Sequence, residues 1–354
     1  MPVPSEISIE VFRGDLNALE KMAHTSWRDE YGISSFPNLY QPEYLRFLFS
    51  PIQDKKHLIA AYKGNEIVSF LANLPRKFCF KGQIYRAVLS GLLVTRKQYL
   101  RQGLAQAVIE KALVLNEEEK YDFALIYMET GHRSNLLMEK MRKAGHPLEW
   151  MKRMYVIARV LDLDGVEASE EMKFWEKMAI KCIGANRLPK KQYFVSLRDY
   201  RKEDLPAALS LLNQYCQKIS LARYWEKEEL EWELDYPDVS KTLIYEKDGQ
   251  VKGLINYVYH EHIGASTKRW AWINHLSYPG LSRKERGAFI NTFLSRMHDE
   301  GCVGVIDWTK NYLSLGTFFR NRFFPYFRAV NMFSWTFNSN ISLKNIRDCN
   351  EVQI

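Results

Sequence analysis

Short apolar stretches with a period of two or of 3.6 residues follow one another through residues 1–162. Alternation over residues 7–12 predicts a strand, and Asp15 is placed to cap the helix that follows. Residues 84–129 predict two parallel strands joined by a right-handed helical crossover. In chain order the predicted elements are strand 7–12, helix 15–27, a loop with a short helix 42–49, the hairpins 58–62/67–74 and 78–80/84–95, helix 103–118, strand 121–129, helix 134–143 and strand 151–161.

A similar order begins again after a predicted linker, residues 163–190, which holds one helix at 170–179. Pro206 suits the first turn of a helix, and Asp248-Gly249 is typical of a tight hairpin turn. The predicted elements are strand 193–197, helix 201–218, the hairpin 242–247/251–259, strand 270–277, helix 285–300, strand 303–308, helix 312–321 and strand 329–337. We therefore expect an α/β (α+β mixed sheet) protein with two similar halves, residues 1–162 and 191–354.

Composition narrows the class of protein. The 354 residues are 46% hydrophobic and 26% charged, which suits a globular protein of about two domains. No apolar run approaches the ~18 residues of a membrane helix, and the start lacks the pattern of a secretory signal. The five cysteines show no metal-ligand spacing. We expect a cytoplasmic protein with no membrane span and no metal.

The net charge of +8 indicates an affinity for anions. The basic residues are spread along the chain and do not form a single stripe, so nucleic acid is not the expected partner. A ligand that carries several phosphate groups fits the same excess of positive charge.

The clearest candidate chemistry lies in residues 92–105, which pass from an apolar strand through a basic loop to a helix start. Free backbone N–H groups and the positive end of the helix dipole favour a diphosphate there. Gly103 and Ala105 leave room for close approach, and Arg96, Lys97 and Arg101 add charge. The same pattern also occurs in ordinary strand–loop–helix connections.

The stretch Tyr99-Leu100-Arg101-Gln102-Gly103-Leu104-Ala105 resembles the pyrophosphate loop of the GNAT (GCN5-related N-acetyltransferase) superfamily, whose loop amides hold the diphosphate of acyl-CoA. Leu100 departs from the arginine or glutamine expected there. Met141 replaces a tyrosine that protonates the leaving thiolate in many members, and we assign it to the core. The resemblance implies that acetyl-CoA or another acyl-CoA is bound by Leu93, Val94, Thr95, Leu100, Arg101, Gln102, Gly103, Leu104, Ala105, Ser134 and Asn135.

The second half resembles the C-terminal half of N-myristoyltransferases, which are themselves tandem GNAT folds. The resemblance rests on residues 197–206, 211–215, 225–230, 307–311 and 331–335. It implies two tandem GNAT-like acyl-CoA N-acyltransferase folds. The second half lacks a glycine-rich loop, so the first would bind acyl-CoA and the second would shape the acceptor side. Its many aromatic residues suit either a core or an apolar pocket; they include Trp225, Trp232, Trp270, Trp272 and Trp308.

Two kinds of catalytic group are expected where strands 84–95 and 121–129 separate. Backbone amides near Gly91 and Leu92, to which the resemblance points, would hold the thioester oxygen. Glu129 and His132 follow the second strand and are candidate bases.

Asp307 ends the equivalent strand of the second half and is a further candidate base. N-myristoyltransferases use the terminal carboxylate of their chain, and the resemblance implies the same role for Ile354.

We therefore predict an N-acyltransferase that moves an acetyl or longer acyl group from acyl-CoA to an amine by direct attack on the thioester. The acceptor remains open among small molecules, peptides and proteins. The alternative is a non-catalytic sensor or scaffold that binds acyl-CoA.

Overall fold

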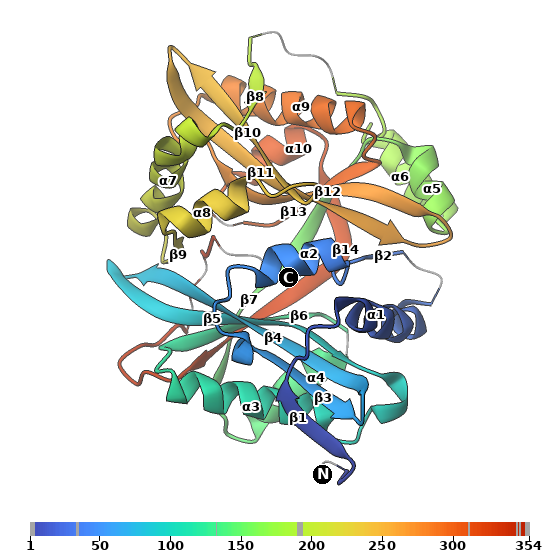
Figure 1. Cartoon of the computed structure of the whole chain (residues 1–354). Helices are drawn as coiled ribbons and strands as arrows, with labels where there is room; N and C mark the ends of the chain where they lie inside the picture. Colours follow the sequence, from blue (N-terminus) through green and yellow to red (C-terminus); the bar gives the residue numbers. More distant parts are fainter. Residues whose placement is uncertain are drawn as a thin grey trace.

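The computed structural model describes residues 4–350 apart from 33–34, 132, 190–193, 311, 345 and 347. The described strands form one sheet that runs through both halves, with helices packed against it (Figure 1). The strands are β1 Ile7–Val11, β2 Phe36–Pro37, β3 Leu58–Lys63, β4 Glu66–Phe80, β5 Gln83–Thr95, β6 Phe123–Glu129, β7 Leu148–Val160, β8 Leu197–Asp199, β9 Leu221–Tyr224, β10 Ser240–Lys247, β11 Gln250–Ile263, β12 Thr267–Ser277, β13 Gly304–Trp308 and β14 Phe324–Thr336. The α-helices are α1 Leu16–Tyr31, α2 Pro42–Phe49, α3 Leu104–Glu118, α4 Arg133–Lys143, α5 Leu163–Ser169, α6 Phe174–Cys182, α7 Leu205–Asn213, α8 Lys227–Leu234, α9 Arg283–Asp299 and α10 Leu315–Arg320.

The order of the strands in the sheet is nearly symmetric about its centre: β1-β3-β4-β5-β6-β14-β7-β13-β12-β11-β10-β8. In the first half β5 and β6 are parallel and α3 connects them, as predicted. In the second half β12 and β13 are parallel and α9 connects them. The mixed sheet with helices confirms the predicted fold class.

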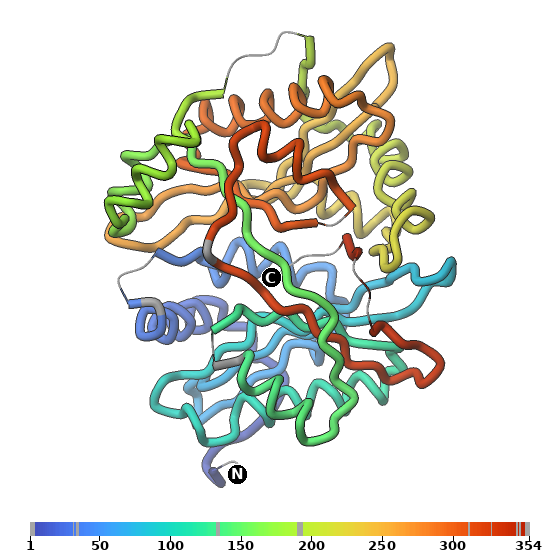
Figure 2. The backbone as a smooth tube through the Cα atoms, turned by 180° about the vertical axis from the view of Figure 1, so that it is seen from behind, coloured from blue at the N-terminus to red at the C-terminus, as the bar shows by residue number. Residues whose placement is uncertain are grey.

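The two halves exchange their last strands. β7, which ends the first half, pairs with β13, whereas β14 at the end of the second half pairs with β6. β7 and β14 also pair with each other, and they run side by side through the middle of the molecule (Figure 2). Each half therefore depends on the other for a complete sheet.

One predicted break in the first half is wrong. Strands 67–74 and 78–80 are one strand, β4, which continues through Pro75. Pro75 pairs with Val88 of β5, but the pairing of β4 with β3 ends at Ala72. Proline lacks an N–H group and is tolerated where one side of a strand is unpaired.

The predicted linker contains two helices, α5 and α6, and not the one helix predicted at 170–179. Asp162 caps α5 by accepting a hydrogen bond from the amide of Gly165 at 3.0 Å. Strand β9, which pairs with β4 of the first half, was not expected. The predicted strand 193–197 is wrong in its described part, because residues 194–196 form no strand and β8 begins only at Leu197.

β5 contains a bulge beside its partner β4. Between the pairs Phe70–Val94 and Ala72–Gly91, β5 has one more residue than β4. Leu92 lies in this bulge with a φ of 54°, which leucine rarely adopts. The bulge turns backbone groups out of the ladder, as bulges near functional sites commonly do.

The largest apolar cluster crosses between the halves. It joins Phe70 and Phe123 of the first half to Val258, Trp270 and Trp308 of the second. Among the described residues, no helix has both the length and the apolar character that a membrane crossing requires.

Candidate active site

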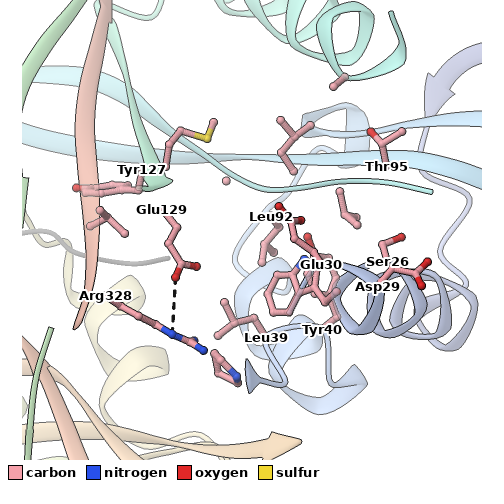
Figure 3. A pocket seen from close by; sticks show the side chains of 18 of the residues that line it. Ser26, Asp29, Glu30, Leu39, Tyr40, Leu92, Thr95, Tyr127, Glu129 and Arg328 are labelled. Atoms are coloured by element: carbon pink, nitrogen blue, oxygen red, sulfur yellow. Dashed lines mark ion pairs between the residues drawn. The ribbon is translucent and has the colours of Figure 1, made fainter. Parts of the chain in front are cut away.

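A cavity of about 540 Å³ lies between α1, the ends of β5 and β6 and the start of α3, and it extends to β12, β13 and β14. Figure 3 shows part of it, where labelled side chains from α1, β5, β6 and β14 surround a common space. Eleven residues that the sequence predicted for the site line this cavity: Gly91, Leu92, Leu93, Val94, Thr95, Leu100, Arg101, Gly103, Leu104, Ala105 and Glu129.

One end of the cavity is formed by the start of α3. Gly103 precedes the helix with a φ of 80°, a conformation that favours glycine. The first hydrogen bond within the helix runs from the amide of Ala107 to the carbonyl of Gly103 at 2.9 Å. The amides of Leu104, Ala105 and Gln106 therefore have no acceptor within the helix. All three residues line the cavity, and their amides and the helix dipole favour an anion there.

Basic side chains surround this end only in part as predicted. Lys97 and Arg101 line the cavity, together with Lys140 from α4, which the sequence reasoning missed. Arg96 does not contribute to the lining, because its side chain lies 2.9 Å from Glu66. Basic side chains in the lining suit a ligand with several phosphates, and Lys97 also lies 3.3 Å from Oδ1 of Asp29, another lining residue.

The middle of the cavity lies where β5 and β6 separate. Their parallel pairing ends at Ser90 and Ile126, and beyond it β5 stays with β4 while β6 stays with β14. Gly91 and Leu92 line one side of the gap, and Glu129 lines the other. Backbone groups of the bulge thus face a space that a small reacting group could enter.

A polar network follows Glu129 along the cavity wall. Nε of Arg328 lies 3.8 Å from Oε1 of Glu129, and Nη2 of Arg328 donates to the carbonyl of Ser35 at 2.8 Å. Glu170 accepts from the hydroxyls of Ser35 and Tyr326, at 2.6 and 3.3 Å. Burial, reinforced by Glu170, raises the pKa of Tyr326, so this phenol stays protonated. The network joins segments far apart in sequence, which sequence patterns alone could not reveal.

The far end of the cavity is aromatic. His262, Trp270, Trp272 and Trp308 line it, whereas Trp225 is buried in the core outside the lining. The ring of His262 stacks on Trp270 at a centroid distance of 5.1 Å. In the sequence, only the abundance of tryptophan indicated an aromatic pocket. The fold was needed to tell which tryptophans line the cavity and which are in the core.

In the second half, the gap between β12 and β13, which corresponds to the gap between β5 and β6, is filled by side chains. Pairing of β12 with β13 ends at Trp272 and Ile306. Just beyond it, the Lys310 ammonium lies 2.7 Å from Oδ1 of Asp307 and 3.4 Å from the carbonyls of Ile273 and Asn274. The first half keeps its gap as a cavity, and the second fills its own with an ion pair.

Several predicted site residues lie away from the cavity. Asp307 is buried against Lys310 and is not part of the lining. Burial raises the pKa of Asp307, although Lys310 opposes this shift. Asn135 accepts a hydrogen bond from Asn331 at 2.8 Å, and the side chain of Gln102 donates to the carbonyl of Gln98 at 3.1 Å.

The remaining predicted groups are partly outside the described residues. His132 and Ile354 lie outside them, and of Ser134 only the backbone in α4 is described. Met141 is buried in an apolar cluster with Met138, so it belongs to the core as predicted. Within the part of the chain that the structure describes, no three His, Cys, Asp or Glu residues are grouped to hold a metal ion.

The fold is GNAT-like and is similar to that of N-myristoyltransferase over the whole chain. N-myristoyltransferase from Saccharomyces cerevisiae with bound myristoyl-CoA aligns with a TM-score of 0.79 and 16% identity over 100% of this chain and 91% of that one. A GCN5-related N-acetyltransferase from Anabaena variabilis aligns with a TM-score of 0.55 and 12% identity, over 92% of this chain and 72% of the other. One from Kribbella flavida aligns with a TM-score of 0.53 and 10% identity, over 94% and 71%.

No family model matches the sequence, and no curated protein matches it. The structural similarity confirms the resemblance in fold that the loop at residues 99–105 and the second half predicted.

Proposed function

We propose that this protein is an acyl-CoA-dependent N-acyltransferase. The observation that carries the proposal is one continuous cavity that joins the start of α3 to the gap between β5 and β6. In this proposal the first half holds the CoA diphosphate on the amides of Leu104, Ala105 and Gln106. The thioester then lies in the gap, and residues of the second half complete the acceptor side. The similarity to a structure that contains myristoyl-CoA supports this placement.

The proposed reaction is a direct transfer. The amine nitrogen attacks the thioester carbonyl carbon, a C–N bond forms, and the C–S bond breaks. Backbone N–H groups of the bulge near Gly91 and Leu92 stabilise the negative charge that develops on the carbonyl oxygen. The nitrogen enters as an ammonium, loses one proton before the attack and a second after it. The second proton ends on the CoA sulfur, so the products are an amide, CoA thiol and one released proton.

Glu129 is our proposed base for the first proton, because its side chain lines the cavity at the end of β6. The terminal carboxylate of Ile354 remains a prediction, since that residue is not described. The last described residues lie beside β9, where the amide of Arg223 donates to Asn350 Oδ1 at 2.6 Å.

The test uses purified protein, a panel of acyl-CoAs from acetyl to myristoyl, and a thiol reagent that detects free CoA. We expect CoA release only when an amine is supplied. Mass spectrometry of the purified protein would identify any retained acyl-CoA and its chain length. Glu129→Gln should lower turnover by about a hundredfold or more while acyl-CoA still binds. CoA release at the same rate without an amine, or no binding of any acyl-CoA, would contradict the proposal.

A further inference from the structure

Two opposite charges lie side by side on the cavity wall next to the gap. The side chains of Glu129 on β6 and Arg328 on β14 point toward one another, with Nε and Oε1 3.8 Å apart (Figure 3). Each side chain is mostly withdrawn from solvent, with 25% and 24% of its surface exposed. A separation of 3.8 Å is an ion pair but exceeds hydrogen-bond length, so the pair is loose.

A hydrogen bond to Ser35 holds the Arg328 side chain in position, and Ser35 is in turn bound by Glu170. Its Nη2 donates to the carbonyl of Ser35 at 2.8 Å, and the hydroxyl of Ser35 donates to Glu170 at 2.6 Å. Tyr326 donates to the second oxygen of Glu170 at 3.3 Å. A guanidinium has five N–H donors in a planar fork, and this geometry suits the recognition of a carboxylate.

The wall beyond Arg328 is aromatic and uncharged. Trp272 donates its indole N–H to Nε2 of His262 at 3.1 Å, and Trp270 stacks on the same imidazole. Burial, and next the positive charge of Arg328, lower the pKa of His262 well below its usual range. This imidazole is therefore neutral, and with Trp308 it forms a surface that suits an apolar group.

We propose that the acceptor is a free α-amino acid with a large apolar side chain. The inference rests on the proposed function and names the substrate class of the same site. The ammonium group lies toward Glu129, the carboxylate pairs with Arg328, and the side chain packs on the aromatic wall. An α-amino acid carries its two charges one carbon apart, which matches two neighbouring opposite charges on the protein.

A peptide N-terminus is disfavoured by the same arrangement. It has a neutral amide where the amino acid has its carboxylate. That amide cannot form the charge-assisted hydrogen bonds that a carboxylate forms with a guanidinium, so a peptide gains less from contact with Arg328.

The experiment compares phenylalanine, phenylalaninamide and alanine as acceptors, using the acyl-CoA that gives the fastest amine-dependent release of CoA. We expect kcat/KM to be roughly ten- to a hundredfold higher for phenylalanine than for its amide, which is what one charged hydrogen-bonding partner contributes. Alanine should be poorer than phenylalanine. Arg328→Gln should lower kcat/KM for the acid roughly tenfold more than for the amide, and Arg328→Lys should be intermediate.

Arg320→Gln is the matched control, because Arg320 is exposed on α10 and outside the cavity lining. Equal use of acid and amide by the unaltered protein would overturn the inference, and so would equal loss of both activities in Arg328→Gln. Equal use of alanine and phenylalanine would overturn the assignment of the side chain. Transfer to amides or peptides alone would overturn this inference and leave the acyltransferase intact. No transfer to any amine would overturn both.

Discussion

At the scale of single residues, the start of α3 depends on backbone conformation more than on side-chain chemistry. Gly103 has a φ of 80°, so a side chain there would strain the backbone. Ala105 lines the same end of the cavity from within the first helical turn. It is therefore the better position for a test of diphosphate binding.

We expect Ala105→Glu to weaken CoA binding at least about tenfold more than Ala105→Gln, measured by isothermal titration calorimetry. The two side chains have nearly the same size, so the difference reports the repulsion between a carboxylate and the diphosphate. A glutamate in the first turn favours the helix, and the fold should be retained. Equal affinities of the two variants would place the diphosphate elsewhere.

At the scale of elements, each half has a gap where two parallel strands separate, and this gap is open in the first half and filled in the second. Both parallel pairs, β5–β6 and β12–β13, stop before their strands end. The first gap is open because the bulge at Leu92 and the start of α3 leave space beside it. The second is filled by the buried pair of Asp307 and Lys310, which are 1% and 2% exposed.

Lys310→Met should destabilise the protein by about 3–5 kcal/mol, because it leaves the Asp307 carboxylate buried without its partner. The double variant Asp307→Asn with Lys310→Met should recover a large part of this loss. The measurement is the free energy of unfolding in urea at neutral pH. If the single and double variants were equally unstable, the ion pair would not be the reason for the loss.

At the scale of the whole molecule, the halves are held together by exchanged strands and by aromatic contacts. His260 on β11 is 1% exposed and packs against Tyr44 of α2, with ring centroids 4.5 Å apart, and against Trp272 at 5.2 Å. Burial lowers the pKa of His260 to about 3. This ring is therefore neutral in the folded protein at pH values where an exposed histidine is protonated.

This shift makes stability depend on pH with a definite sign. Below about pH 6.5 His260 is protonated in the unfolded chain, whereas in the folded protein it stays neutral down to about pH 3. The free energy of unfolding therefore falls as the pH drops toward 3. The lowered pKa of His262 also makes stability fall as the pH drops. His260→Phe should reduce the slope of the unfolding free energy between about pH 6 and 4 by up to about 1.4 kcal/mol per pH unit. Urea unfolding at several pH values measures this slope, and an unchanged slope would contradict the assignment.

The sequence alone was enough for most of the elements, for the fold class and for the helix start that forms one end of the cavity. These features depend on local patterns: the period of apolar residues, the turn residues, and Gly103 and Ala105 before and within the first turn of α3. Local patterns also led to errors, because the strand predicted to end at residue 74 continues through Pro75, where β4 is still paired with β5 but no longer with β3.

Only the tertiary structure decided the exchange of β7 and β14, and this exchange places Arg328 beside Glu129. The two residues are almost two hundred positions apart, and no local periodicity records such a contact. The fold likewise separated Asp307, closed off by Lys310, from Glu129, which lines the cavity, although both end equivalent strands. Whether a carboxylate is buried in a pair or faces a ligand depends on long-range packing, which the sequence specifies only through the complete fold.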